Sequence, residues 1–236
     1  MTLGTLYLIP VPLGPMAPQA CLPPDVIATV RPLAYFVVEQ AKTARAFLKA
    51  VGTDLPLQSL HLAELNEHTR REALAALLQP LLNGHDIGLL SEAGCPAIAD
   101  PGADLVALAQ ERGVRVAPLI GPSSILLALM ASGLNGQRFA FHGYLPAKEA
   151  DRTKSLRDLE SESRKKRQTQ LFIETPYRNL ALFESLRANL QPGTRLTVAT
   201  DISLPGESIK THSIQAWKRL APPDIERRPT VFLLLA

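Results

Sequence analysis

Two stretches of short side chains stand out as places where a ligand can approach the main chain. The first, LSEAGCPAIADPG (residues 90–102), follows a strand-like run and contains two glycines and two prolines. The second is PLIGPSS, residues 118–124. Because small residues leave N–H and C=O groups accessible, loops of this kind can hold the polar groups of a small ligand. The two stretches therefore predict a binding site built largely from backbone.

Both stretches also have a purely structural interpretation. Asp100 before Pro101 fits a helix N-cap followed by proline at the first helical position, and we favour that role over a catalytic one. Ser123 or Ser124 fits the cap of the helix that follows. Residues 90–102 nevertheless make a longer connection than a plain strand-to-helix turn requires. We therefore expect this loop to bind a ligand as well.

The elements that position these loops alternate between strand and helix. A leucine repeat at i, i+3, i+4 and i+7 predicts one amphipathic helix from about Thr69 to Leu81. Continuous apolar strands between such helices predict a parallel sheet covered on both faces, with ligands beyond the carboxyl ends of its strands. The expected strands of this half are residues 6–11, 34–39, 86–92 and 114–119.

The pattern changes after Gly121. Residues 125–133 (ILLALMASG) are apolar all round, which predicts a buried helix. Strand-like runs follow at 139–146 and 170–175, and the last of three late strands is VFLLL, residues 231–235. We expect an α/β protein with two α/β domains, residues 1–118 and 119–236.

Composition excludes several classes of protein. No run approaches the roughly 20 apolar residues that cross a bilayer, and the first residues do not resemble a signal peptide. Two cysteines without a CxxC motif argue against structural zinc or a disulfide framework and favour the cytoplasm. A net charge of +3 permits a polyanionic partner, whereas 5% aromatic residues argue against a stand-alone RNA-binding module. The glycine motifs of dinucleotide and P-loop sites are absent.

Several segments in sequence order resemble one family. LSEAGCPAIADPG, VRVAPLIGPSSILLALMASGL and RFAFHGYLPAK match the central signature of the tetrapyrrole-methylase-like superfamily. The sequence is most similar within it to the small-subunit ribosomal RNA (cytidine 2′-O)-methyltransferase family. GTLYLIPVPLG and QLFIETPYRNL extend the resemblance from about Gly4 to Arg178.

The resemblance implies a methyltransferase that uses S-adenosylmethionine, with a parallel N-terminal sheet, a mixed C-terminal sheet and a cofactor cleft between them. It also implies a homodimer and ribosomal RNA, or the small ribosomal subunit, as a partner. The residues that it assigns to the cofactor are Pro10, Gly94, Cys95, Ala97, Ser123, Ser124, Tyr144, Pro229 and Thr230.

The sequence departs from that family on the expected substrate side. The usual acidic–Asp–Thr–Arg run begins with Glu39 but then reads Gln40-Ala41-Lys42, and Leu65 replaces a histidine before Asn66. Lysine does not reproduce the two-pronged grip of arginine on an anion. Three functions therefore stay open: a ribosomal RNA methyltransferase, a methyltransferase for a tetrapyrrole-like or other small metabolite, and a non-catalytic protein that binds S-adenosylmethionine.

Methyl transfer from a sulfonium needs an aligned acceptor and no metal, but an oxygen acceptor needs a base. Glu39, Glu67 and Glu174 flank predicted strand ends, and we hypothesise that Glu39 or Glu67 positions or deprotonates the acceptor. A surface carboxylate or a helix cap is the alternative for each of them. We interpret His142 as a hydrogen-bonded core residue. The basic run 164–167 can contact phosphates, but a solvated loop or helix end is the favoured interpretation.

Overall fold

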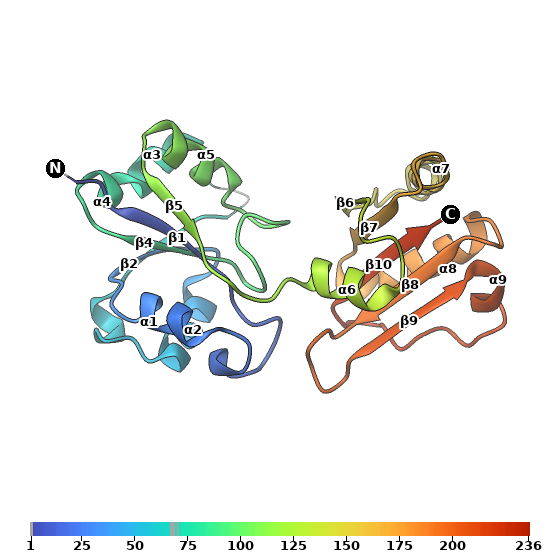
Figure 1. Cartoon of the computed structure of the whole chain (residues 1–236), viewed down its shortest axis with the longest axis horizontal. Helices are drawn as coiled ribbons and strands as arrows, with labels where there is room; N and C mark the ends of the chain where they lie inside the picture. The colour runs from blue at the N-terminus through green and yellow to red at the C-terminus, as the bar shows by residue number, and fades with distance from the viewer. Residues whose placement is uncertain (1, 67–68, 70) are drawn as a thin grey trace. The chain divides into compact units, whose positions relative to one another are not determined.

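The structure is a computed structural model that describes residues 2–66, 69 and 71–236. The chain divides into two compact units, Met1–Ser123 and Ser124–Ala236. Each unit has one five-stranded sheet with helices packed on it (Figure 1). Within the described residues, no helix has the length and apolar character needed to cross a membrane.

The sheet of the first unit is parallel throughout, as predicted. Its strand order is β3-β2-β4-β1-β5, and each neighbouring pair has parallel register. β4 is buried at all four positions, which is the continuous apolar pattern of a strand covered on both faces. The strands are β1 Thr5–Ile9, β2 Tyr35–Val38, β3 His61–Glu64, β4 Ile87–Leu90 and β5 Arg115–Pro118.

Helices cover both faces of this sheet (Figure 1). α1 (Pro24–Val30) and α2 (Ala41–Val51) pack on one face, and α5 (Ala103–Glu111) packs on the other. The helix predicted from Thr69 to Leu81 is interrupted: α3 covers Arg71–Leu77 and α4 covers Gln79–Leu82. Pro80 has no N–H to donate to the preceding turn, so one continuous helix cannot form. Single 3₁₀ turns lie at η1 Pro18–Ala20, η2 Leu57–Ser59 and η3 Pro176–Arg178.

The second unit has the predicted mixed sheet. Its order is β6-β7-β10-β8-β9; β6 and β7 are parallel, and the other neighbours are antiparallel. The strands are β6 Phe139–Tyr144, β7 Thr169–Ile173, β8 Arg195–Thr200, β9 Ser208–Ser213 and β10 Thr230–Leu235. The central strand, β10, is buried at its first five positions.

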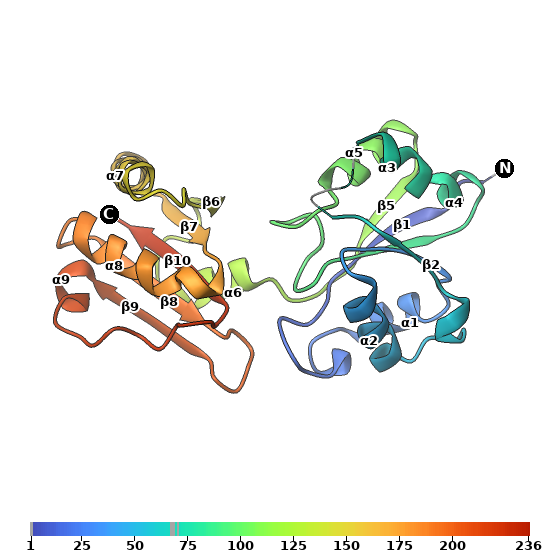
Figure 2. The same cartoon turned by 180° about the vertical axis from the view of Figure 1, so that it is seen from behind.

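Helices of the second unit lie on opposite faces of its sheet (Figures 1 and 2). α7 (Glu149–Lys166) and α8 (Asn179–Asn189) enclose one apolar core with the short α9 (Ile214–Trp217). α6 (Ser124–Ser132) packs on β8, β9 and β10. The prediction that α6 is fully buried is wrong, because Leu126 is 51% and Met130 is 77% exposed. The helix is apolar all round, yet only one of its faces meets the sheet.

Candidate active site

The two predicted ligand-binding loops lie side by side beyond the carboxyl ends of β1, β4 and β5. Val11 and Gly94 form an antiparallel bridge, with N–H···O distances of 2.9 and 3.0 Å in the two directions. The Cys95 thiol donates a hydrogen bond of 3.4 Å to the Pro122 carbonyl oxygen. Burial raises the pKa of this thiol, so it keeps the proton that it donates. The structure therefore joins the loop after β4 to the loops after β1 and β5.

Close packing of these loops depends on Gly121. A Cβ atom at this position would lie 2.3 Å from Cγ and 2.5 Å from Cβ of Pro10. Non-bonded carbon atoms do not approach so closely, so only glycine lets the β5 loop pass the Pro10 ring. We call the loops that follow β1 (from Pro10), β4 (residues 91–102) and β5 (residues 119–123) the three-loop assembly. Pro10 and Gly94, which were predicted to contact the cofactor, are thus fixed within it.

The backbone between Ser91 and Gly102 is unusual. Gly94, Ala97 and Ala99 have φ values of 74°, 65° and 62°. The two alanines adopt a left-handed conformation that costs roughly 1–2 kcal/mol for a residue with a Cβ atom. Such strained positions cluster at ligand sites, where the conformation directs main-chain groups toward a ligand. Short side chains, closely packed loops and this backbone together fit a nucleoside-sized ligand held by main-chain hydrogen bonds.

Three further predicted cofactor contacts, Tyr144, Pro229 and Thr230, belong to the second unit. Tyr144 ends β6, Pro229 precedes β10 and Thr230 begins it, which places them at one end of that sheet. Tyr144 is 55% exposed. The Thr230 hydroxyl donates to the Arg228 carbonyl at 3.0 Å and lies 3.2 Å from the Thr200 hydroxyl. The Thr230 side chain is thus used within the fold.

Ser123 is the last residue of the first unit, and Ser124 is the first residue of α6. Both side chains are partly exposed. Their positions immediately before and at the helix start fit the predicted capping function as well as a contact to a ligand.

Three carboxylates gather at the carboxyl ends of β2 and β4. Glu39 follows β2, Glu92 follows β4, and Asp100 lies in the loop after β4. The pKa of Asp100 is raised from 3.8 to about 6, first by burial and then by the charge of Glu39, with a smaller contribution from Glu92. The neighbouring Ser91 side chain acts in the opposite direction. Asp100 is therefore a half-buried carboxyl group that titrates close to neutral pH.

The prediction that Asp100 caps a helix is wrong. α5 begins at Ala103, its N-cap is Gly102, and no side chain caps it. Gly102 has φ 131°, and this bend separates Asp100 from the helix start. Asp100 instead lines a pocket of about 630 Å³, a volume typical of ligand sites, together with Asn66, Thr69 and Asp104. The Asp-Pro-Gly run of residues 100–102 was compatible with a ligand-binding loop, but it was also compatible with a helix cap.

A residue of α2 holds the Glu92 side chain in place. The Thr43 hydroxyl donates a 2.6 Å hydrogen bond to Glu92 Oε1. Both side chains line a second pocket, of about 240 Å³, which lies between α2 and the loop that contains Val11 and Gly14. This pocket adjoins the loop after β1, so polar groups from α2 and β4 are available beside the three-loop assembly.

Other predicted residues lie outside this cluster. Glu174 directly follows β7, as expected, but its side chain is only 1% exposed and accepts hydrogen bonds from Arg178 at 2.6 and 3.1 Å, so the two residues form a structural ion pair. His142 lies 2.6 Å from the buried Gln170 amide oxygen, which confirms a hydrogen-bonded residue, but it is exposed rather than in the core. Glu67 lies outside the described residues. Among the described residues, no three acidic, histidine or cysteine side chains form a metal site.

Comparison with known proteins agrees with this architecture. Residues 8–216 match the family of Tetrapyrrole (Corrin/Porphyrin) Methylases. The fold and the paired loops thus define the class of S-adenosylmethionine-dependent methyltransferases built from two α/β units. The chain belongs to the tetrapyrrole methylase family.

Its relatives include one set of closely similar enzymes. The chain is 33% identical to ribosomal RNA small subunit methyltransferase I of Pseudomonas aeruginosa over 89% of its own length and 71% of the relative. It is 35% identical to the same enzyme of Escherichia coli O157:H7, over 87% and 68% of the two chains. The fold is also that of uroporphyrin-III C-methyl transferase from Thermus thermophilus, solved with S-adenyl homocysteine (TM-score 0.54, 16% identity, covering 98% and 97%).

Proposed function

We infer that this protein is an S-adenosylmethionine-dependent methyltransferase that acts on small-subunit ribosomal RNA in the cytoplasm, and we propose a ribose 2′-hydroxyl as the acceptor. The observation that carries the inference is 33% identity over 89% of the chain to an enzyme named for that RNA. A small-molecule methyltransferase or a non-catalytic binding protein has no comparable support.

The three-loop assembly supplies the cofactor side of the proposal. Main-chain groups at Cys95 and Ala97 lie in a loop kept close by Gly121 and can hold the polar groups of S-adenosylmethionine. Gly94, whose N–H and C=O pair with Val11, stays a proposed contact through its lack of a side chain. Ser123, Ser124, Tyr144, Pro229 and Thr230 stay proposed contacts. When bound, this cofactor supplies an electrophilic methyl group. The loops need only orient the ligand and exclude water, since neither a metal nor a covalent intermediate is required.

The three carboxylates Glu39, Glu92 and Asp100, which we call the acidic cluster, supply the proton acceptor. A hydroxyl that attacks a methyl group loses its proton as the new bond forms, and a base with a pKa near the working pH accepts it best. The raised pKa of Asp100, about 6, meets that condition, and Asp100 lines a pocket large enough for a nucleotide. We propose Asp100 as the base and Glu39 as the neighbour that tunes it; Glu67 stays a candidate for positioning the acceptor.

The function is tested by transfer of labelled methyl groups to small ribosomal subunits, purified ribosomal RNA and a metabolite extract. Digestion of the labelled RNA to nucleosides then identifies the modified atom. We expect label only in RNA, as a 2′-O-methyl nucleoside. Label confined to metabolites would replace the substrate assignment, and absence of transfer despite S-adenosylmethionine binding would favour a non-catalytic protein.

Replacing Glu39 with glutamine should shift the pH dependence of turnover. The variant removes a negative charge that raises the pKa of Asp100, so the acidic limb of the kcat profile should move to lower pH. Plateau kcat should change less than about tenfold, because Glu39 is not the proposed base. Loss of the base itself would lower kcat by roughly 10²–10⁴-fold. A loss above about 100-fold at every pH would instead make Glu39 the base. Glu67→Ala, measured in parallel, tests the remaining candidate.

We propose that the protein is a homodimer. Leu126 and Met130 are one helical turn apart on α6, on a face that stays exposed while Ala128 and Leu129 are buried. Exposed apolar side chains in such a row are typical of an interface. Light scattering should give about twice 25.6 kDa for the wild type and a lower mass for Met130→Glu. Ser161→Glu on α7 is the control, and a wild-type mass of 25.6 kDa would exclude the dimer.

A further inference from the structure

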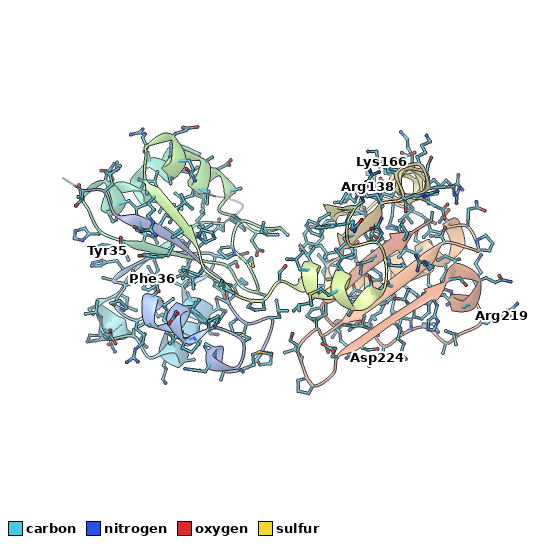
Figure 3. All side chains as sticks on the ribbon, viewed as in Figure 1. Tyr35, Phe36, Arg138, Lys166, Arg219 and Asp224 are labelled. Atoms are coloured by element: carbon cyan, nitrogen blue, oxygen red, sulfur yellow. The ribbon has the colours of Figure 1, made fainter. Side chains whose placement is uncertain are left out.

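The second unit carries an exposed cluster of cations that the proposed chemistry does not use. It gathers at the end of the sheet where β6, β7 and β8 begin. We call it the basic end patch; its residues are Arg138, Arg164, Lys165, Arg167 and Arg195. All five side chains are exposed. Figure 3 shows Arg138 beside Lys166, at the end of α7.

Hydrogen bonds fix the segments that carry the patch. The Arg138 guanidinium donates to the Lys166 carbonyl at 3.4 Å, and the Asn135 amide donates to the Arg167 carbonyl at 2.6 Å. Arg195 Nη1 donates to the Gly133 carbonyl at 3.5 Å. The loop before β6, the end of α7 and the start of β8 are thus linked by side-chain to main-chain contacts. These contacts leave the positive charges themselves without neutralisation.

Nearby acids do not balance the patch. Glu160 is 5% exposed and accepts a 2.8 Å hydrogen bond from the Gln191 amide, so its charge faces inward. Glu162 accepts a 2.6 Å hydrogen bond from Lys166, which is why Lys166 is not counted in the patch. Within the part of the chain that the structure describes, none of the five patch cations forms an ion pair. The outward charge here is therefore positive.

The composition of the patch favours a nucleic acid. Four of its five members are arginines, whose planar guanidinium groups match the geometry of phosphate. Phe139, directly after Arg138, is 40% exposed and offers a ring on which an unpaired base can stack. Cations from three chain segments beside an exposed aromatic ring form a surface suited to the backbone of a folded RNA.

We propose that the basic end patch binds ribosomal RNA at a distance from the nucleotide that is methylated. β6 runs from Phe139 at the patch to Tyr144 at the proposed cofactor end, a length of roughly 16–20 Å at 3.3 Å per residue. The patch therefore contacts a remote part of a large substrate and increases its affinity without touching the reacting atoms. The identity of the RNA rests on the proposed function; the binding surface rests on the patch itself.

The test compares two variants that remove the same charge. The patch variant is Arg164→Gln/Lys165→Gln/Arg167→Gln, and the control is Lys49→Gln/Arg112→Gln/Arg115→Gln, three exposed cations of the first unit. RNA binding is measured by filter retention between 50 and 200 mM salt. The patch variant should bind small-subunit RNA about tenfold or more weakly, with a salt slope shallower by about 2–3, as expected for three lost phosphate contacts. Equal binding by the two variants would overturn the proposal.

Kinetics separate a binding surface from a catalytic role. For the patch variant, KM for small subunits should rise about tenfold, while kcat and the Kd for S-adenosylmethionine stay unchanged. A short oligonucleotide around the methylated nucleotide should show no difference between the two variants, because it lacks the separate part of the RNA that the patch is proposed to bind. Unequal kcat, or an equal loss with the short oligonucleotide, would contradict a remote anchor.

Two further results keep this proposal distinct from the proposed function. If the wild type methylates no RNA, the proposed function fails, but the salt-dependent comparison of RNA binding still decides whether the patch binds RNA.

If the patch variant loses binding to vesicles of anionic phospholipid and keeps its affinity for RNA, the surface binds membranes and our assignment is wrong. Unchanged thermal midpoints of both variants confirm that the exposed substitutions leave the fold intact.

Discussion

Replacing Gly121 with alanine should abolish most of the affinity for S-adenosylmethionine. The new methyl group would lie 2.3 Å from Cγ of Pro10, in a ring that cannot rotate away from it. The β1 and β5 loops must therefore separate, and the main-chain groups that meet the ligand move with them. A shift of about 1 Å breaks hydrogen bonds that require 2.7–3.2 Å, so we expect the Kd to rise at least tenfold.

The measurement is titration calorimetry with S-adenosylmethionine and its demethylated product. Overpacking also costs stability, roughly 1–3 kcal/mol, so binding is measured well below the thermal midpoint of each variant. Gly193→Ala is the matched control because its added Cβ would meet no atom within 4 Å. If Gly121→Ala bound the cofactor as well as this control, the three-loop assembly would not be the cofactor site.

A second substitution tests the stated cause. Pro10→Gly removes both ring atoms that the methyl group introduced by Gly121→Ala would strike, although Leu22 Cδ2 stays 3.0 Å away. The double variant should therefore bind the cofactor more tightly than Gly121→Ala alone. Such a coupling between neighbouring sites is what a direct steric conflict predicts. Additive losses would show that Gly121→Ala acts through some other part of the fold.

The sheet of the first unit could be predicted because local and global signals agree. β4 reads as an uninterrupted apolar run and is buried at every position, and α2 ends at Val51, before Gly52, whose φ of 77° is that of a left-handed C-cap. The antiparallel neighbours of the second sheet were implied only by family resemblance. Their pairing depends on contacts far apart in sequence, such as Phe232 with Val198, which periodicity does not encode.

Two errors have physical causes that a sequence does not display. α6 was predicted to be buried because no face of it is polar, yet burial depends on how many partners surround a helix, and the described structure provides a sheet on one face. Asp100 was assigned to a cap because Asp-Pro is common at helix starts. The positive φ of Gly102 moves the helix start beyond Asp100. The acidic cluster then arises from strand order, which brings Glu39 after β2 next to the loop after β4.

Asp100→Asn should stop catalysis while stabilising the fold. If Asp100 accepts the proton of the acceptor hydroxyl, kcat should fall about 10²–10³-fold, with the Kd for S-adenosylmethionine changed less than threefold. In the wild type, activity should decline as pH falls through about 6, because the carboxyl group becomes protonated. The residual activity of the variant should lack this limb. The profile is measured with labelled methyl transfer to small subunits between pH 5 and 8.

The free energy of unfolding of Asp100→Asn gives an independent check, because it should rise while kcat falls. The pKa of Asp100 is about 6 in the folded protein against an ordinary value of 3.8, so the folded state holds the proton more tightly than the unfolded state between these values. Wild-type stability must fall as pH rises through this window. The asparagine side chain of the variant carries no charge to desolvate, so at pH 7 the variant should gain roughly 1–2 kcal/mol, a figure reduced for solvent screening. A structural Asp100 predicts the reverse: lower stability at every pH, with turnover lost only in proportion to unfolding.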